Sequence, residues 1–233
     1  ELKSRKVIIN LSPADIKKEG SIFDLAIAIG ILVNMGIIRC ENIREYVFIG
    51  ELSLNGKINK INGILPMCIE AKKLGINKII IPKENEKEAS IVKDIHIIGI
   101  RTLNDLIKYL NGDIVIKSER INVEELLNDT NNYKLDFSEV KGQENIKRAL
   151  EVAAAGGHNC LLIGNPGSGK TMMARRLPTI LPDLTFEEAL EVTKIHSIAG
   201  LLDTNQAIIN TRPFRSPHHT ISGVSLVGRR QNS

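Results

Sequence analysis

One stretch decides the fold of the second half of this 233-residue chain: Gly164-Asn165-Pro166-Gly167-Ser168-Gly169-Lys170-Thr171. It matches the pattern GxxxxGK[ST] at every fixed position. A polyphosphate needs several backbone N–H groups pointing inward at once, and glycines such as Gly167 and Gly169 allow the chain to curve that tightly. Lys170 can reach the β- and γ-phosphates, and the Thr171 hydroxyl can ligate Mg²⁺. The stretch therefore predicts a loop that binds ATP together with Mg²⁺.

The segments around this loop predict an α/β unit. Residues 160–163 are a short apolar run, predicted as a buried strand that leads into the loop, and a helix is expected to follow the loop. Residues 143–155 have helical periodicity, with Gly156-Gly157 as their C-terminal stop. Thr185-Phe186-Glu187-Glu188 is a capping box and predicts a helix that runs to about Ile195. A strand, a phosphate loop and a helix in this order are typical of P-loop proteins.

The first part of the chain, to about Lys117, predicts a separate mixed α/β unit. Asn55-Gly56 between two short β-rich runs is a strong hairpin signal, because both turn residues tolerate positive φ. Residues 118–136 are polar and rich in asparagine, and they predict a linker. The other elements are expected as strands over 6–11, 46–49, 78–81 and 95–98 and as helices over 25–33, 65–74, 83–92 and 102–110.

Composition excludes several classes of protein. Hydrophobic residues make up 42% and charged residues 25%, which argues against wholesale disorder. The longest apolar run, Leu25 to Val33, is too short to span a bilayer. Three cysteines without a CxxC pair exclude a disulfide framework and a cysteine-rich zinc site, and they fit a reducing cytoplasm. The chain opens at Glu1 and not at a methionine, so a processed or truncated start is expected.

Charge is unevenly distributed along the chain. Lys plus Arg number 31 and Asp plus Glu 27, but no acidic residue follows Asp203, whereas four arginines do. This basic segment can meet the phosphates of a nucleotide or nucleic acid, or it can be a solvated loop, and charge alone leaves both readings open. Tryptophan is absent and aromatic residues are only 3%, so no stacking platform for single-stranded nucleic acid is evident.

Parts of an ATP-hydrolysing machinery are not recognisable. P-loop enzymes hold Mg²⁺ with an acidic residue after a second apolar strand, and a further group orients the attacking water. No apolar run ending in an acidic residue follows Thr171, and no sensor motif or arginine-finger helix is evident before Ser233. ATP binding is therefore predicted, no residue is assigned a catalytic role, and hydrolysis by this chain alone is not predicted.

Several segments of the second half resemble known ATPases. The segment Phe137-Ser138-Glu139-Val140-Lys141-Gly142-Gln143 resembles the part of AAA+ ATPases that contacts adenine, which implies this role for Val140 and Gln143. Packing at the domain edge is the other reading for Val140, and both can hold together. The strings that resemble the magnesium-chelatase-like AAA+ ATPases of the YifB/ComM family are residues 192–197, residues 199–202 and Arg212-Pro213-Phe214-Arg215-Ser216-Pro217-His218-His219-Thr220-Ile221-Ser222. Residues 229–233 depart from the family pattern, and a frameshifted or truncated gene product is expected.

The first part of the chain also resembles that family, whose N-terminal region is similar to the catalytic domain of Lon protease. The resemblance is carried by residues 15–21, 50–56 and 71–85. Ile22 then stands at the position of the Lon serine and Leu65 at that of its lysine, so neither the nucleophile nor its activating base is present. Ser21 is a shifted candidate nucleophile, but no lysine replaces the partner in register. No protease activity is expected.

The sequence thus predicts an α/β chain with two domains and a linker. These are a Lon-protease-like α+β domain without the Ser-Lys dyad over residues 1–117, a linker over 118–136, and the N-terminal part of an AAA+ P-loop domain over 137–233. The resemblance implies that the full-length protein is a cytoplasmic ATPase that assembles into a hexameric ring. It further implies action on DNA, in branch migration or competence. No association with a membrane is expected, because no apolar run is long enough to span a bilayer.

Four side chains of the basic segment, Arg212, Arg215, His218 and His219, are the candidates for contact with DNA or with a neighbouring subunit. Hydrogen bonding within a loop is the other reading for the two histidines, and metal ligation is disfavoured because no carboxylate or cysteine lies near them in the sequence. Two other functions stay open. One is a magnesium-chelatase ATPase subunit, and the other is a truncated, non-catalytic module that only binds nucleotide.

Overall fold

A computed structural model of the chain describes residues 7–10, 21–118, 122, 126, 133 and 135–217. The chain divides into two compact units. Unit 1 comprises Glu1–Asn128 and Thr185–Ile209, and unit 2 comprises Asp129–Leu184 and Asn210–Ser233. The sequence analysis assigns residues 185–209 to the P-loop domain, but in the structure they pack with unit 1. Among the described residues, no helix combines the length and the apolar character needed to cross a membrane.

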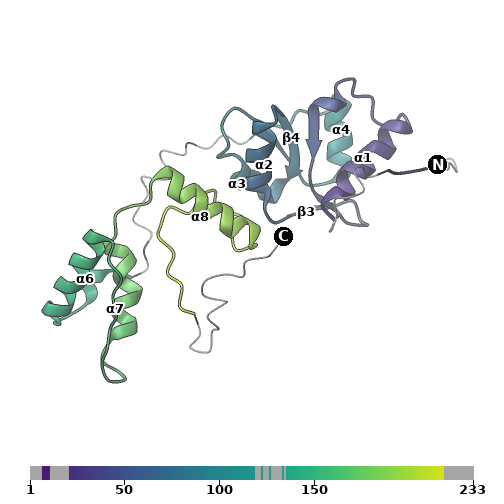
Figure 1. Cartoon of the computed structure of the whole chain (residues 1–233). Coiled ribbons are helices and arrows are strands. Elements are labelled where there is room, and N and C mark those ends of the chain that lie inside the picture. The colour runs from purple at the N-terminus through teal and green to yellow at the C-terminus, as the bar shows by residue number, and fades with distance from the viewer. Residues whose placement is uncertain are drawn as a thin grey trace. The chain divides into compact units, whose positions relative to one another are not determined.

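A parallel three-stranded sheet lies at the centre of unit 1 (Figure 1). Strand β4 (Lys78–Pro82) is in the middle, between β1 (Tyr46–Phe48) and β5 (His96–Ile100). Successive side chains of a strand point to opposite faces. Accordingly, Ile79 and Ile81 pack into one apolar cluster and Ile80 into another. The three predicted strands 46–49, 78–81 and 95–98 are confirmed, and the sheet makes the chain a mixed α/β protein.

A short antiparallel hairpin accompanies the sheet. Its strands are β2 (Glu51–Leu52) and β3 (Ile58–Asn59), and the turn between them contains Asn55-Gly56 as predicted. Gly56 has a φ of +81°, which favours glycine, and its N–H donates to the carbonyl of Ser53 over 2.9 Å. The local turn signal was therefore sufficient to place this hairpin.

Helices cover both faces of the sheet in unit 1 (Figure 1). Helices α1 (Asp24–Asn34) and α4 (Leu103–Leu110) contribute to the cluster around Ile80, and α2 (Ile64–Lys73) and α3 (Glu86–Ala89) to the cluster around Ile79 and Ile81. The short 3-10 helices of this unit are η1 (Ser21–Phe23), η2 (Ile43–Glu45) and η3 (Lys83–Asn85). Burial on both faces explains why β4 is an almost uninterrupted apolar run.

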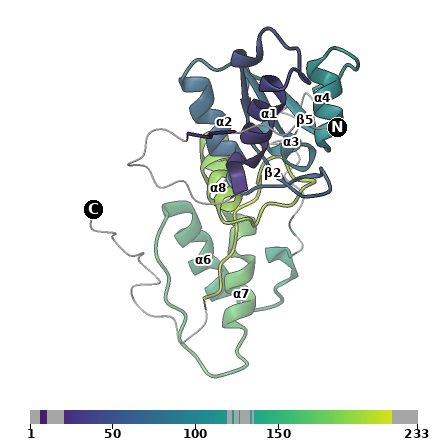
Figure 2. The same ribbon diagram turned by 90° about the vertical axis from the view of Figure 1, so that its right-hand side faces the viewer.

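Helix α8 (Phe186–Ile198) completes unit 1 and packs against α2 (Figure 2). The predicted capping box is present at its start, where Thr185 Oγ1 accepts from the N–H of Glu188 over 3.2 Å and the Glu188 carboxylate accepts from the N–H of Thr185 over 3.0 Å. At its end, Ser197 donates its hydroxyl proton to the buried Glu88 carboxylate, and the carbonyl of Ser197 accepts from the N–H of Gly63 over 3.0 Å. Polar contacts thus fix the end of α8 on unit 1.

Unit 2 contains α6 (Glu144–Gly156) and α7 (Lys170–Arg176), with the 3-10 helices η4 (Phe137–Glu139) and η5 (Leu177–Ile180). Gly157 ends α6 with a φ of +63°, close to the predicted glycine stop. One small apolar cluster of this unit has Phe137, Val140, Leu150 and Met173 as its buried members, and Ala153 and Ala154 of α6 are also buried.

The prediction of a strand over residues 160–163 is wrong. These residues form no strand, and the side chains of Leu161 and Ile163 are 85% and 87% exposed. A strand is held by hydrogen bonds to a neighbour. The described part of unit 2 contains no other strand that could pair with this run.

Two further predictions about unit 1 need correction. Residues 7–10, the described part of the predicted strand 6–11, form no strand. The predicted helix 83–92 is shorter, because η3 and the four-residue α3 occupy only residues 83–89. Asn85, Glu86 and Glu88 of this segment are buried, although its polar sequence favours an exposed helix.

Candidate functional site

The loop Gly164–Thr171 has the backbone shape that its glycines permit. Gly167 and Gly169 have φ values of +80° and +86°, in the left-handed region that other residues rarely adopt. A Cβ atom at Gly164 would lie 3.1 Å from Ser168 Oγ, so this glycine allows a close approach within the loop. Asn165 and Pro166 are exposed. Every glycine of the motif therefore has a local conformational reason.

Lys170 holds its ammonium group against this loop. Its Nζ donates to the carbonyl oxygen of Gly164 over 2.8 Å, to that of Asn165 over 2.7 Å and to Ser168 Oγ over 3.2 Å. An ammonium group has three N–H bonds, so these contacts can occupy all of its donors. A bound phosphate would have to replace some of them. The following residue, Thr171, is exposed in the first turn of α7.

The loop fits a polyphosphate better than it fits a bare metal ion. The open space beside Gly167, where a Cβ atom would meet nothing within 4 Å, and the cation of Lys170 suit an anionic ligand. Among the described residues, no group of three or more His, Cys, Asp or Glu side chains is arranged to hold a metal ion. Mg²⁺ would therefore be held by the nucleotide phosphates, water and the Thr171 hydroxyl.

The segment just before α6 carries the residues that resemble an adenine contact. Val140 is buried and packs with Phe137, Leu150 and Met173. This agrees with the alternative role given to Val140 in the sequence analysis, which is packing at the domain edge. Gln143 is exposed and has a φ of +60°, directly after Gly142 at +69°. A glutamine in this region is uncommon, and two such residues in succession give the chain a sharp bend before the helix.

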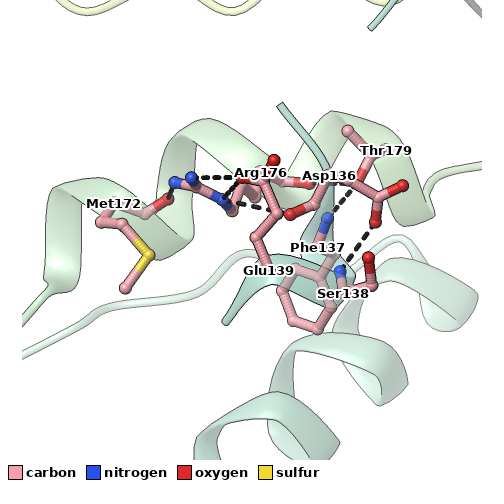
Figure 3. Close-up of polar contacts among 7 residues, drawn as sticks. All are labelled: Asp136, Phe137, Ser138, Glu139, Met172, Arg176 and Thr179. Carbon is pink, nitrogen blue, oxygen red and sulfur yellow. Dashed lines mark hydrogen bonds and ion pairs between the residues drawn. The ribbon is translucent and has the colours of Figure 1, made fainter. Parts of the chain in front are cut away.

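A polar cluster that the sequence did not predict joins this segment to α7 (Figure 3). Nη2 and Nε of Arg176 donate to one carboxylate oxygen of Glu139 over 2.6 Å and 3.1 Å, and Nε also donates to the carbonyl of Asp136 over 3.1 Å. Thr179 Oγ1 accepts from the N–H of Phe137 over 3.1 Å. Arg176 and Glu139 lie 37 positions apart, so no local pattern could have revealed the pair.

Asp136 lies at the start of the same segment. The Ser138 side chain and the Ser138 backbone N–H, which donates over 2.7 Å, lower the pKa of the Asp136 carboxyl below its ordinary value. The carboxylate thereby caps η4. This contact orders the chain immediately before Phe137.

The nucleic-acid candidates of the basic segment are only partly described. The backbone N–H of Arg212 donates to the Tyr133 hydroxyl over 2.9 Å, and its Nε donates to the carbonyl of Pro182 over 2.7 Å, so this side chain helps to hold the segment on unit 2. Arg215 is exposed. His218 and His219 lie outside the described residues.

Ser21, the shifted candidate nucleophile, has a carboxylate as its hydrogen-bond partner. Ser21 donates its hydroxyl proton to the carboxylate of Glu51, which also accepts from the side chain of Asn59 over 3.2 Å. These two hydrogen bonds, Ser21 first, lower the pKa of the Glu51 carboxyl and make it a weaker base. Ile22 is partly buried and Leu65 is fully buried in the unit.

Comparison with known proteins extends over most of the chain. The family model described as magnesium chelatase, subunit ChlI, matches residues 136–233, and the one described as subunit ChlI of Mg-chelatase matches residues 1–85. The competence protein ComM of Haemophilus influenzae is 39% identical over 97% of this chain, and the protein YifB of Escherichia coli is 40% identical over 98% of it. A shorter match of 61 residues, 26% of this chain and 13% of its relative, is 43% identical to the DNA repair protein RadA of Listeria monocytogenes.

The chain spans 44% of the length of both ComM and YifB. The two family models describe successive parts of the chain as ChlI, and the identity to ComM and YifB covers nearly all of it. This chain belongs to the YifB/ComM family of magnesium-chelatase-like AAA+ proteins.

Proposed function

We propose that this chain binds ATP through the loop Gly164–Thr171. The observation that carries the proposal is the loop itself, in which Gly167 and Gly169 adopt positive φ and the Lys170 ammonium lies against the loop carbonyls. When nucleotide binds, Lys170 turns from these carbonyls to the phosphate oxygens, and Thr171 offers its hydroxyl to Mg²⁺. The metal ion supplies charge neutralisation of the phosphates. Val140 and Gln143 are proposed to border the adenine.

We infer that the full-length protein uses this site in work on DNA. Support comes from the names of two relatives, a competence protein and a DNA repair protein. The inference includes a cytoplasmic hexameric ring, with Arg212, Arg215, His218 and His219 facing DNA or a neighbouring subunit. Unit 1 is proposed to be a Lon-like domain without protease activity, since Ser21 is bonded to a carboxylate and not to a lysine.

A second candidate is a magnesium-chelatase ATPase subunit, and the descriptions of both family models favour it. The two functions can be distinguished by measuring which ligand stimulates ATP turnover in a full-length relative. Stimulation by DNA supports the first, and stimulation by a porphyrin with the other chelatase subunits supports the second. A chain that binds ATP without turnover under either condition supports the third possibility, a nucleotide-binding module.

The first test is calorimetric titration of the 233-residue chain with ATP in the presence and absence of Mg²⁺. Lys170→Ala is expected to weaken binding about 10- to 100-fold, because it removes charge-assisted hydrogen bonds to the phosphates. Lys147→Ala is the matched control, since the ammonium of this lysine pairs with Glu144 within α6 over 3.1 Å. Equal affinity of Lys170→Ala and the unaltered chain would refute the proposed site.

A further inference from the structure

The guanidinium of Arg176 joins two segments that are far apart in the sequence (Figure 3). Nη1 donates to the carbonyl of Met172 in the same helix over 3.2 Å, while Nε and Nη2 reach the Glu139 carboxylate. The Arg176 side chain is only 15% exposed, whereas that of Glu139 is 50% exposed. A planar guanidinium held from several directions fixes the direction of its partner more closely than a single contact would.

A second, independent contact ties the same two segments. Thr179, in η5, accepts a hydrogen bond from the backbone of Phe137 and donates its own proton to the carbonyl of Arg176 over 2.8 Å. The side chains of Phe137 and Val140 pack against Met173 of α7. The segment Phe137–Gln143 is thus held on α7 and η5 by an ion pair, a backbone hydrogen bond and apolar packing.

The same helix connects this clamp to the phosphate loop. Helix α7 starts at Lys170 and ends at Arg176, so the residue proposed to bind phosphate and the residue that holds Phe137–Gln143 lie at its two ends. The clamped segment Phe137–Gln143 ends with Gly142 and Gln143, which both have positive φ. Because Gln143 is not a glycine, this conformation is unfavourable in isolation and needs support from its surroundings.

We propose that Arg176, Glu139 and Thr179 form a positioning clamp that sets the affinity for the nucleoside part of the ligand and leaves the affinity for its phosphate chain nearly unchanged. The proposal rests on the nucleotide-binding function proposed above. The clamp residues act through Phe137–Gln143 and are positioning residues, not catalytic ones. Disconnecting the segment from α7 lets Gly142 and Gln143 relax, while Lys170 and the loop keep their own contacts.

The test compares two ligands, ATP and inorganic tripolyphosphate, each titrated with Mg²⁺ into the 233-residue chain. Arg176→Met is expected to weaken ATP binding about 5- to 20-fold and tripolyphosphate binding less than about twofold, since it removes the charged contact to Glu139. Glu139→Gln is expected to act in the same direction, and Arg176→Lys to retain part of the ATP affinity. Lys170→Ala is expected to weaken both ligands alike.

Two controls protect the interpretation. Arg148→Met removes an exposed ion pair to Glu151 within α6 that joins no separate segments, and it should leave both affinities unchanged. If Arg176→Met unfolds unit 2, as judged by circular dichroism, Glu139→Gln still tests the clamp, because it leaves the contacts of Arg176 to Asp136 and Met172 in place.

Equal weakening of ATP and tripolyphosphate by Glu139→Gln would overturn the clamp, because the pair would then support only the fold of the loop. If the unaltered chain binds ATP and tripolyphosphate equally well, the proposed nucleoside contact is refuted, whereas phosphate binding by the loop is supported. If it binds neither ligand, the proposed function fails and the clamp falls with it. The ratio of the two affinities therefore distinguishes the two failures.

Discussion

In unit 1, strand β4 is covered on both faces, with Ile79 and Ile81 in one apolar cluster and Ile80 in the other. In unit 2, the apolar run 160–163 is not covered in this way, and Leu161 and Ile163 remain exposed. Apolar burial stabilises a fold by roughly 25 cal/mol for each Å² of apolar surface removed from water. Unlike a hydrogen bond, it does not depend on the relative orientation of the groups. The sheet of unit 1 therefore relies mainly on buried apolar area.

Unit 2 depends more on directed contacts. The apolar cluster around Val140 is small, while the single side chain of Arg176 makes hydrogen bonds to Asp136, Glu139 and Met172. Directed contacts fail when one partner is changed, because the other partner then loses its hydrogen bond. The candidate nucleotide site thus lies in unit 2, where a few polar side chains such as Arg176 fix how the segments are arranged.

The largest expected effect comes from breaking the core of unit 1. Ile80→Ala removes a fully buried side chain from the middle strand, and a loss of about 2–5 kcal/mol in the free energy of unfolding is expected from lost burial and the cavity left behind. Chemical denaturation followed by circular dichroism measures it. Ile195→Ala, on the exposed side of α8, is the control and should change stability by less than about 0.5 kcal/mol. Similar losses for the two variants would contradict the two-cluster core.

Amide hydrogen exchange compares the two units directly. Amides of β4 and β5 are expected to exchange on the order of a hundredfold more slowly than those of α6 and α7, because segments with less buried apolar surface open locally at a lower free energy. Mass spectrometry of the exchanged chain provides the measurement. Equal protection of the two units would show that unit 2 has support beyond its described core.

A moderate effect is expected where α8 meets unit 1. Ser197→Ala leaves the buried Glu88 carboxylate without one of its donors, and a loss of about 1–3 kcal/mol is expected. Thermal unfolding by calorimetry measures the change, with the exposed Glu191→Ala on the same helix as the control. No change in Ser197→Ala would mean that the side-chain hydrogen bond from Ser197 to Glu88 adds nothing to the attachment of α8.

The smallest effect is a pKa change at the surface of unit 1. The Ser21 hydroxyl lowers the pKa of Glu51 in the folded state, so this contact stabilises the fold above the ordinary pKa of 4.5, and the stabilisation is lost as pH falls through the lowered value. Ser21→Ala should move the Glu51 pKa upward, as an NMR titration of the carboxyl would show. An unchanged or lower pKa would mean that Asn59 is the dominant partner.

Local signals in the sequence predicted local structure well. The hairpin at Asn55-Gly56, the capping box at Thr185 and the glycine stop after α6 are confirmed, because each depends on residues a few positions apart. The candidate phosphate loop is recognisable for the same reason, since its glycines and Lys170 form one continuous string.

What the sequence missed depends on partners far along the chain. Residues 160–163 have the composition of a strand, but a strand forms only beside a neighbour. Glu88 lies in a polar stretch of sequence and is nevertheless buried against Ser197, 109 positions away. The Arg176–Glu139 pair likewise joins separate segments. Composition and spacing alone carry no information on such contacts.

The contribution of residues 185–209 to unit 1 has a consequence for the order of events during synthesis. The surface of α2 and α3 that receives α8 is made early, but it stays uncovered until Ile209 has left the ribosome. At about 5–20 residues per second, the roughly 100 residues after α4 take roughly 5–20 s to appear. The candidate phosphate loop is therefore translated before unit 1 can close, and a pause or chaperone acting in that interval would meet an unfinished first unit.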